Sequence, residues 1–154
     1  MPSMTFERDL TVASDREKCW AVLTDVPRLV SWVSIVQDAK EVSPLERYTA
    51  VLMDRLGPFK LRADLDISVD EVRENEHVHV KAAGEDRQVS SRIGIDASLS
   101  LTPIDGGGTT IAVTGSYEVI GRVATLGAGM IRQKAAKILD EFFAHAAAEL
   151  DGRS

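Results

Sequence analysis

Few side chains in this 154-residue sequence have a type and spacing that could carry chemistry. His77 and His79 lie two residues apart, so in a strand they would share one face, and a pair of histidines can ligate a metal ion. No third ligand follows at a diagnostic spacing, and Val78, Val80 and Ala82 form the opposite, apolar side. We therefore expect the two histidines to face solvent, and we expect no metal and no other cofactor.

Asp54 is a more informative carboxylate, because it interrupts an apolar alternation. A two-residue turn at Gly57-Pro58 would direct the even-numbered residues of the preceding arm inward, Asp54 among them. A bulge that shifts the register by one would send Asp54 outside instead, and the sequence leaves both arrangements open. An inward carboxylate needs a hydrogen-bonding partner or a raised pKa, and Arg8 and Tyr117 are the partners that the sequence offers.

Composition excludes some classes of protein. The sequence is 44% hydrophobic and 27% charged, which is typical of a globular domain. Its 24 acidic and 18 basic residues give a net charge of -6, which disfavours a nucleic-acid partner. Positive charge is concentrated on the final helix, at Arg122, Arg132, Lys134 and Lys137. These residues could contact an anionic lipid surface or an acidic partner, or they could form an ordinary solvated face.

The location of the protein can be anticipated from its cysteine content and its apolar stretches. A single cysteine, Cys19, forms no internal disulfide, and its apolar helical context indicates a core residue. Residues 1–7 lack the pattern of a signal peptide, and no apolar run reaches the length of a membrane span. We expect a cytoplasmic protein that is one domain over residues 1–154.

The first third of the chain predicts a strand followed by two short helices. Alternation over residues 4–12 indicates a half-buried strand. Ser14 with Glu17 has the spacing of a capping box, which predicts that Ser14 begins a helix. That helix ends before Pro27, which can open a second short helix.

The remainder predicts six strands and a long helix. The strands are expected over residues 33–42, 47–56, 59–72, 77–84, 89–101 and 109–120, with glycine turns at Gly57-Pro58 and at Gly106, Gly107 and Gly108. An apolar stripe at three- and four-residue steps predicts a helix that continues to about Leu150. The whole pattern predicts an α+β fold with a curved antiparallel sheet of about seven strands around a C-terminal helix.

Small residues near the start of the final helix, Gly127, Ala128 and Gly129, suggest that space remains between the helix and the sheet. Such a space would be a ligand cavity with apolar walls. We expect its ligand-binding residues to be Leu52, Asp54, Leu61, Leu65, Ile95, Leu99, Tyr117, Leu126 and Met130.

Several segments of the sequence carry a resemblance to a known family. The stretch from Val12 to Asp25 contains a Trp-x-x-Leu-x-Asp pattern and resembles the opening of the START/Bet v 1-like (SRPBCC) superfamily. Within that superfamily the chain is most similar to the family of the carbon monoxide dehydrogenase G-subunit. The segments that resemble this family are residues 56–60, 121–127 and 140–143.

The resemblance implies a helix-grip fold, in which a curved sheet surrounds a C-terminal helix and a ligand cavity. It also implies a non-enzymatic protein that binds a lipid or a quinone-like molecule. Members of the family accompany molybdenum hydroxylases and are linked with recruiting the enzyme to the membrane. A peripheral position at the inner face of the membrane follows from the same resemblance.

Two other functions remain open at this stage. The first is a small enzyme of the polyketide cyclase/dehydratase kind, which would need Asp54, Arg8 and Tyr117 to converge in the cavity. The second is a protein-interaction adaptor that docks through Trp32, Ile35 and the basic final helix, although Trp32 is also a natural core residue.

Overall fold

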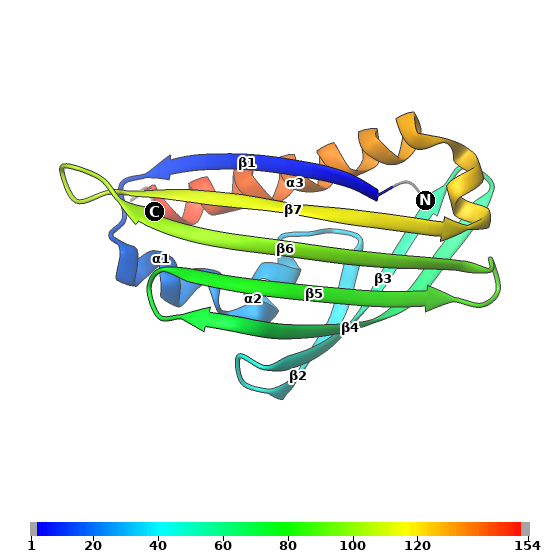
Figure 1. The fold of residues 1–154 in the computed structure, drawn as a ribbon, viewed down its shortest axis with the longest axis horizontal. Helices are drawn as coiled ribbons and strands as arrows, with labels where there is room; N and C mark the ends of the chain where they lie inside the picture. Colours follow the sequence, from blue (N-terminus) through cyan, green and yellow to red (C-terminus); the bar gives the residue numbers. More distant parts are fainter. Residues whose placement is uncertain (1–2, 152–154) are drawn as a thin grey trace.

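A curved antiparallel sheet of seven strands surrounds one long helix (Figure 1). The computed structural model describes residues 3–151. The sheet has the order β1-β7-β6-β5-β4-β3-β2, and its strands are β1 (Ser3–Val12), β2 (Val36–Ser43), β3 (Arg47–Leu56), β4 (Phe59–Arg73), β5 (His77–Asp86), β6 (Ser91–Pro103) and β7 (Thr109–Gly121). The predicted α+β helix-grip fold is confirmed. The prediction of one domain also covers residues 1–2 and 152–154, which lie outside the described residues.

Three α-helices and a 3-10 helix complete the described part of the chain. The short helices α1 (Arg16–Leu23) and α2 (Val26–Ser31) lie between β1 and β2, and the long helix α3 (Ala128–Leu150) follows β7. Figure 1 shows α3 running alongside β1 and β7 on the same side of the sheet as α1 and α2. Within residues 3–151, the other face of the sheet has no helix on it.

The start of α1 differs from the expected capping box. Asp15 is the N-cap, and its carboxylate accepts a hydrogen bond from the backbone N–H of Lys18 at 2.8 Å. Ser14 instead connects the start of α1 with α3 and β7. Its backbone N–H donates to the carbonyl of Leu150 in α3, and its own carbonyl accepts from the hydroxyl of Thr109 in β7. The sequence pattern was wrong by one residue because an aspartate next to the serine takes the capping role.

The β3–β4 hairpin fixes the direction of Asp54. Leu56 pairs with Phe59 across a two-residue turn, in which Gly57 has the positive φ of 57° that such turns need at their first position. The ladder then continues without a bulge, and Asp54 pairs with Leu61. Asp54 therefore shares the inner face of the sheet, and the alternative of a shifted register is wrong.

The final helix is divided into two parts. A 3-10 helix, η1 (Arg122–Leu126), follows β7 directly, and Gly127 with a φ of 96° separates it from α3. Gly127 and Gly129 are exposed, and a side chain at either position would meet nothing within 4 Å. These glycines therefore do not create the space beneath the helix, and the expectation that they do is wrong.

The interior of the protein consists of two apolar clusters. The first joins the C-terminal half of α3 to α1 and to β5, β6 and β7, and its buried members include Trp20, Ile111, Phe143, Ala146 and Leu150. The second lies at the other end of the molecule and has as its buried members Leu52, Leu61, Ala63, Leu65, Val119 and Val123. The helix α3 is thus tightly packed at one end, while its N-terminal half passes over the second cluster.

Candidate functional site

An apolar cavity of about 210 Å³ lies between the N-terminal half of α3 and the inner face of the sheet. Two charged side chains, Asp54 and Lys134, and the aromatic side chain of Tyr117 are among the residues that line it. The other lining residues are Phe6, Ile35, Leu52, Leu56, Leu61, Ile93, Ile95, Val119, Val123, Ile131, Ala135, Ile138 and Leu139. A site of this kind suits an apolar or amphipathic small molecule.

Two periodicities place these side chains. Strand residues two apart share a face, so Ile93 with Ile95 and Tyr117 with Val119 point inward together. Helix residues three and four apart share a face, so Ile131, Lys134, Ala135 and Ile138 form one stripe of α3 directed at the cavity. The small side chain of Ala135 in the middle of that stripe leaves room that a larger residue would occupy.

Five of the nine residues expected to bind a ligand line the cavity, and they are Leu52, Asp54, Leu61, Ile95 and Tyr117. The other four lie elsewhere. Leu65 is buried within the second cluster, Leu99 packs against the first, Leu126 packs beside Gly57, and Met130 is 40% exposed.

Sequence reasoning missed most of the helix side of the cavity, including Lys134. A signal for it was present, since Ile131, Ala135 and Ile138 belong to the apolar stripe and Lys134 lies among them. Phe6, Ile93 and Val119 could also have been found. Ile93 and Val119 are two residues from Ile95 and Tyr117, and Phe6 lies on the apolar face of its own alternating strand.

Asp54 and Lys134 form an ion pair between β3 and α3. The Lys134 Nζ lies 2.8 Å from the Asp54 Oδ2, and the side chains of Lys134 and Asp54 are 34% and 14% exposed. The Lys134 ammonium is thus the charged partner of the buried Asp54 Oδ2. The Asp54 Oδ1 accepts the backbone N–H of Arg55 at 2.8 Å.

The three groups required for an enzymatic site do not assemble. Arg8 forms an ion pair with Asp140 of α3 and does not line the cavity. The Tyr117 hydroxyl approaches the Met4 Sδ at 3.4 Å, and burial raises the pKa of Tyr117 above its ordinary value of 10.0. Asp54 thus has Lys134 as its charged partner, in place of Arg8.

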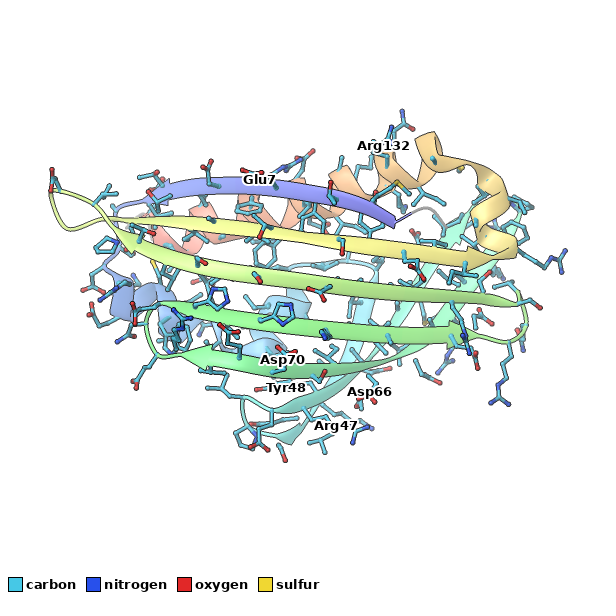
Figure 2. All side chains as sticks on the ribbon, viewed as in Figure 1. Glu7, Arg47, Tyr48, Asp66, Asp70 and Arg132 are labelled. Atoms are coloured by element: carbon cyan, nitrogen blue, oxygen red, sulfur yellow. The ribbon has the colours of Figure 1, made fainter. Side chains whose placement is uncertain are left out.

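The histidines are held in polar contacts outside the cavity. His79 bridges two carboxylates, with its Nδ1 at Asp70 and its Nε2 at Asp96, and these hydrogen bonds raise its pKa. His77 contacts the Ser100 hydroxyl at 2.9 Å. Figure 2 shows Asp70 on the helix-free face of the sheet. Within residues 3–151, no group of three or more His, Cys, Asp or Glu side chains could hold a metal ion.

Trp32 and Cys19 are core residues. Trp32 is 4% exposed, and its ring lies 5.5 Å from that of Phe142. The docking role considered for Trp32 is therefore wrong, because its side chain is covered. Cys19 is fully buried, and burial raises the pKa of its thiol.

The fold and the cavity define the class of the protein as a START-like helix-grip domain. The chain belongs to the CoxG family, that of the carbon monoxide dehydrogenase G-subunit, which it matches over residues 9–151. No curated protein sequence gives a significant match. Among the helices of the described residues, none combines the length and the apolar character that crossing a membrane requires.

Solved structures share this fold. A conserved protein from Geobacillus kaustophilus has a TM-score of 0.83 at 23% identity, with 95% of this chain and 94% of that chain covered. A START superfamily protein from Mycobacterium smegmatis has a TM-score of 0.66 at 14% identity, with 92% of each chain covered. A protein from Thermus thermophilus has a TM-score of 0.66 at 14% identity and 96% coverage of each chain.

Proposed function

We propose that this protein binds a hydrophobic or amphipathic small molecule, lipid-like or quinone-like, in the cavity under α3, without acting as an enzyme. The observation that carries the proposal is the apolar space of about 210 Å³ in a domain whose other helix contacts are well packed. An engineered apolar protein cavity of about 150 Å³ binds benzene, so this one can hold a substituted ring or a short chain.

Membership of the CoxG family supports a second part of the proposal. The protein would be an accessory of a molybdenum hydroxylase such as carbon monoxide dehydrogenase, acting at the inner, cytoplasmic face of the membrane. Exposed Arg132 and Lys137 on α3 give it a basic surface, although the chain as a whole is acidic. Co-sedimentation of the hydroxylase with membranes should then depend on this protein.

Native mass spectrometry after incubation with a bacterial lipid extract tests the binding function. The wild-type protein should retain a bound apolar molecule. Ala135→Phe should abolish or strongly weaken retention, because the phenyl ring would occupy the cavity. Ala144→Phe, on an exposed position of the same helix, is the matched control and should bind as the wild type does.

Circular dichroism should show that both variants remain folded, since an added ring in a packed site can cost about 1–3 kcal/mol. The proposal would be contradicted by a wild-type protein that stays ligand-free. Equal retention by the folded Ala135→Phe variant would contradict it as well.

A further inference from the structure

Three segments that are far apart in the sequence meet at the end of the molecule opposite α1 (Figure 1). We call this part the basic end, and it consists of residues 54–62 with the β3–β4 turn, residues 85–92 with the β5–β6 turn, and residues 121–134 with η1 and the start of α3. Hydrogen bonds from the backbone join the segments. The N–H of Arg62 donates to the carboxylate of Asp86 at 2.7 Å, and the N–H of Arg122 donates to the carbonyl of Ser90 at 3.2 Å.

The charge of the basic end is opposite to that of the whole chain, which has 18 basic and 24 acidic residues. Its basic residues are Arg55, Lys60, Arg62, Arg87, Arg92, Arg122, Arg132 and Lys134, and its acidic residues are Asp54, Glu85 and Asp86. Two of these three carboxylates already have cationic partners, since Asp54 contacts Lys134 and Glu85 contacts two arginines. Exposed Lys60 and Arg132 form no ion pair with a carboxylate of residues 3–151, so their charge is available to a partner.

Apolar side chains are exposed among these basic residues. The stretch from Val123 to Ile131 contains no charged residue, and its Met130 is 40% exposed. Leu126 and Met130 lie over the β3–β4 turn, because a β-carbon added to Gly57 would come within 3.0 Å of Leu126 Cδ2 and 4.0 Å of Met130 Cε. An exposed apolar surface beside lysine and arginine side chains is typical of a protein that contacts the membrane interface.

The combination of charge and apolar surface selects one kind of partner. An anionic bilayer attracts lysine and arginine to its surface, and its interfacial region accepts apolar side chains. A nucleic acid would satisfy the positive charge but would leave Leu126 and Met130 without an apolar partner. The lipid surface is therefore the partner that fits both features.

We propose that the basic end docks on an anionic lipid bilayer, with Leu126 and Met130 at the level of the head groups and Lys60 and Arg132 against the lipid phosphates. This inference rests on the proposed position at the membrane and names the surface that makes the contact. Val123 and Ile131, at the two ends of the uncharged stretch, also line the cavity. Docking in this orientation brings the cavity close to the apolar phase that a lipid-like ligand would leave or enter.

Co-sedimentation with vesicles tests the contribution of charge. One set of vesicles contains equal parts of phosphatidylglycerol and phosphatidylcholine, and the other contains phosphatidylcholine alone. The wild type should bind the first set and not the second. The double variant Lys60→Gln with Arg132→Gln should bind the anionic vesicles on the order of tenfold more weakly, because each basic residue near such a surface strengthens binding several-fold.

A matched control removes the same charges elsewhere. Lys18→Gln with Arg73→Gln replaces one lysine and one arginine at exposed positions outside the basic end, and it should bind as the wild type does. Both double variants should retain a bound apolar molecule in native mass spectrometry as the wild type does, which would show that the fold and the cavity are intact.

A fluorescent label tests whether the apolar side chains enter the bilayer. An environment-sensitive probe is attached to the cysteine of Met130→Cys, and the native Cys19 is fully buried and so does not compete for the label. The emission should shift to the blue when anionic vesicles are added. Val42→Cys carries the label at another exposed apolar position, which is 57% exposed, and should show no shift.

The outcomes separate the docking surface from the proposed function. Equal binding of anionic vesicles by the two double variants, or equal shifts for the two labelled positions, would overturn the basic end as the docking surface and leave the membrane position to another surface. Equal binding of both sets of vesicles by the wild type would overturn the role of its charge. Failure of the wild type to bind any vesicle would overturn the membrane position as well, while ligand retention in native mass spectrometry would still support the cavity.

Discussion

The imidazole of His79 on β5 lies against the carboxylate of Asp96 on β6, with 2.5 Å between the His79 Nε2 and the Asp96 Oδ1. The other ring nitrogen contacts Asp70 on β4, so one side chain links three neighbouring strands on the helix-free face of the sheet (Figure 2). Both ring nitrogens can donate only when the imidazole is protonated. This link is therefore sensitive to pH.

The free energy of unfolding should fall as the pH rises above the neutral range. Hydrogen bonds to Asp70 and then Asp96 raise the pKa of His79 above its ordinary value of 6.5. The contribution of protonated His79 to the free energy of unfolding is fully present below the ordinary pKa of 6.5, and it is lost as the pH rises through the higher pKa of the folded state. The pKa of Asp70 is lowered from 3.8, mainly by its hydrogen bond to His79, so its contribution is lost only in more acidic solution.

Urea unfolding of His79→Gln at about pH 5.5 and about pH 8.5 measures this effect. The variant should show a smaller decrease in unfolding free energy between the two conditions than the wild type. Ser98→Ala replaces the residue directly opposite His79 on β6 and keeps all three titratable groups, so its pH dependence should match the wild type. An unchanged pH dependence in His79→Gln would show that the link does not contribute.

Thr109→Val should destabilise the junction between β7, α1 and α3. The Thr109 hydroxyl is fully buried and donates to the Ser14 carbonyl at 2.9 Å, and the Ser14 N–H donates to Leu150 at 3.0 Å. Valine has nearly the same shape but leaves that carbonyl short of a donor, which should cost about 1–3 kcal/mol of unfolding free energy. Thermal or urea unfolding measures it, and Thr114→Val at an exposed position should have little effect.

The two ends of α3 should respond differently to truncation. Leu150 is fully buried in the first cluster, whereas Ile138 borders the cavity and is partly exposed. Leu150→Ala should cost close to the upper end of the usual range of about 2–5 kcal/mol, and Ile138→Ala close to the lower end, because fewer packing contacts are lost beside an existing space. Equal losses of unfolding free energy would argue that the N-terminal half of α3 is packed as tightly as the rest.

Charge reversal on α3 should weaken any binding to anionic membranes. Arg132 and Lys137 are exposed, and Figure 2 shows Arg132 near the end of the molecule where α3 begins. The double variant Arg132→Glu with Lys137→Glu should lose co-sedimentation with vesicles that contain anionic lipid, because each basic residue near such a surface contributes about 1 kcal/mol. Lys18→Glu with Arg73→Glu changes the net charge equally at two other exposed positions, and it should bind as the wild type does.

Local patterns in the sequence were sufficient for the order of the elements. Strict alternation in β4 and the glycine turn before it predicted the β3–β4 hairpin, while the choice between a regular ladder and a bulge beside Asp54 stayed open. The apolar stripe of α3 predicted a helix that packs on the sheet. These features depend on neighbours a few residues apart, so a single sequence can carry them.

The sequence by itself determined the helix-grip architecture and the alternation of the strands, but it left the direction of Asp54 open until the regular β3–β4 ladder decided it. Only the tertiary structure decided that Lys134, far along the chain, is the partner of Asp54 and that Arg8 is instead paired with Asp140. It also decided that Gly127 and Gly129 lie at exposed positions, so these glycines do not form the cavity. The physical reason is that the curvature of the sheet sets the distance between α3 and each strand, and this distance depends on the packing of all the elements together.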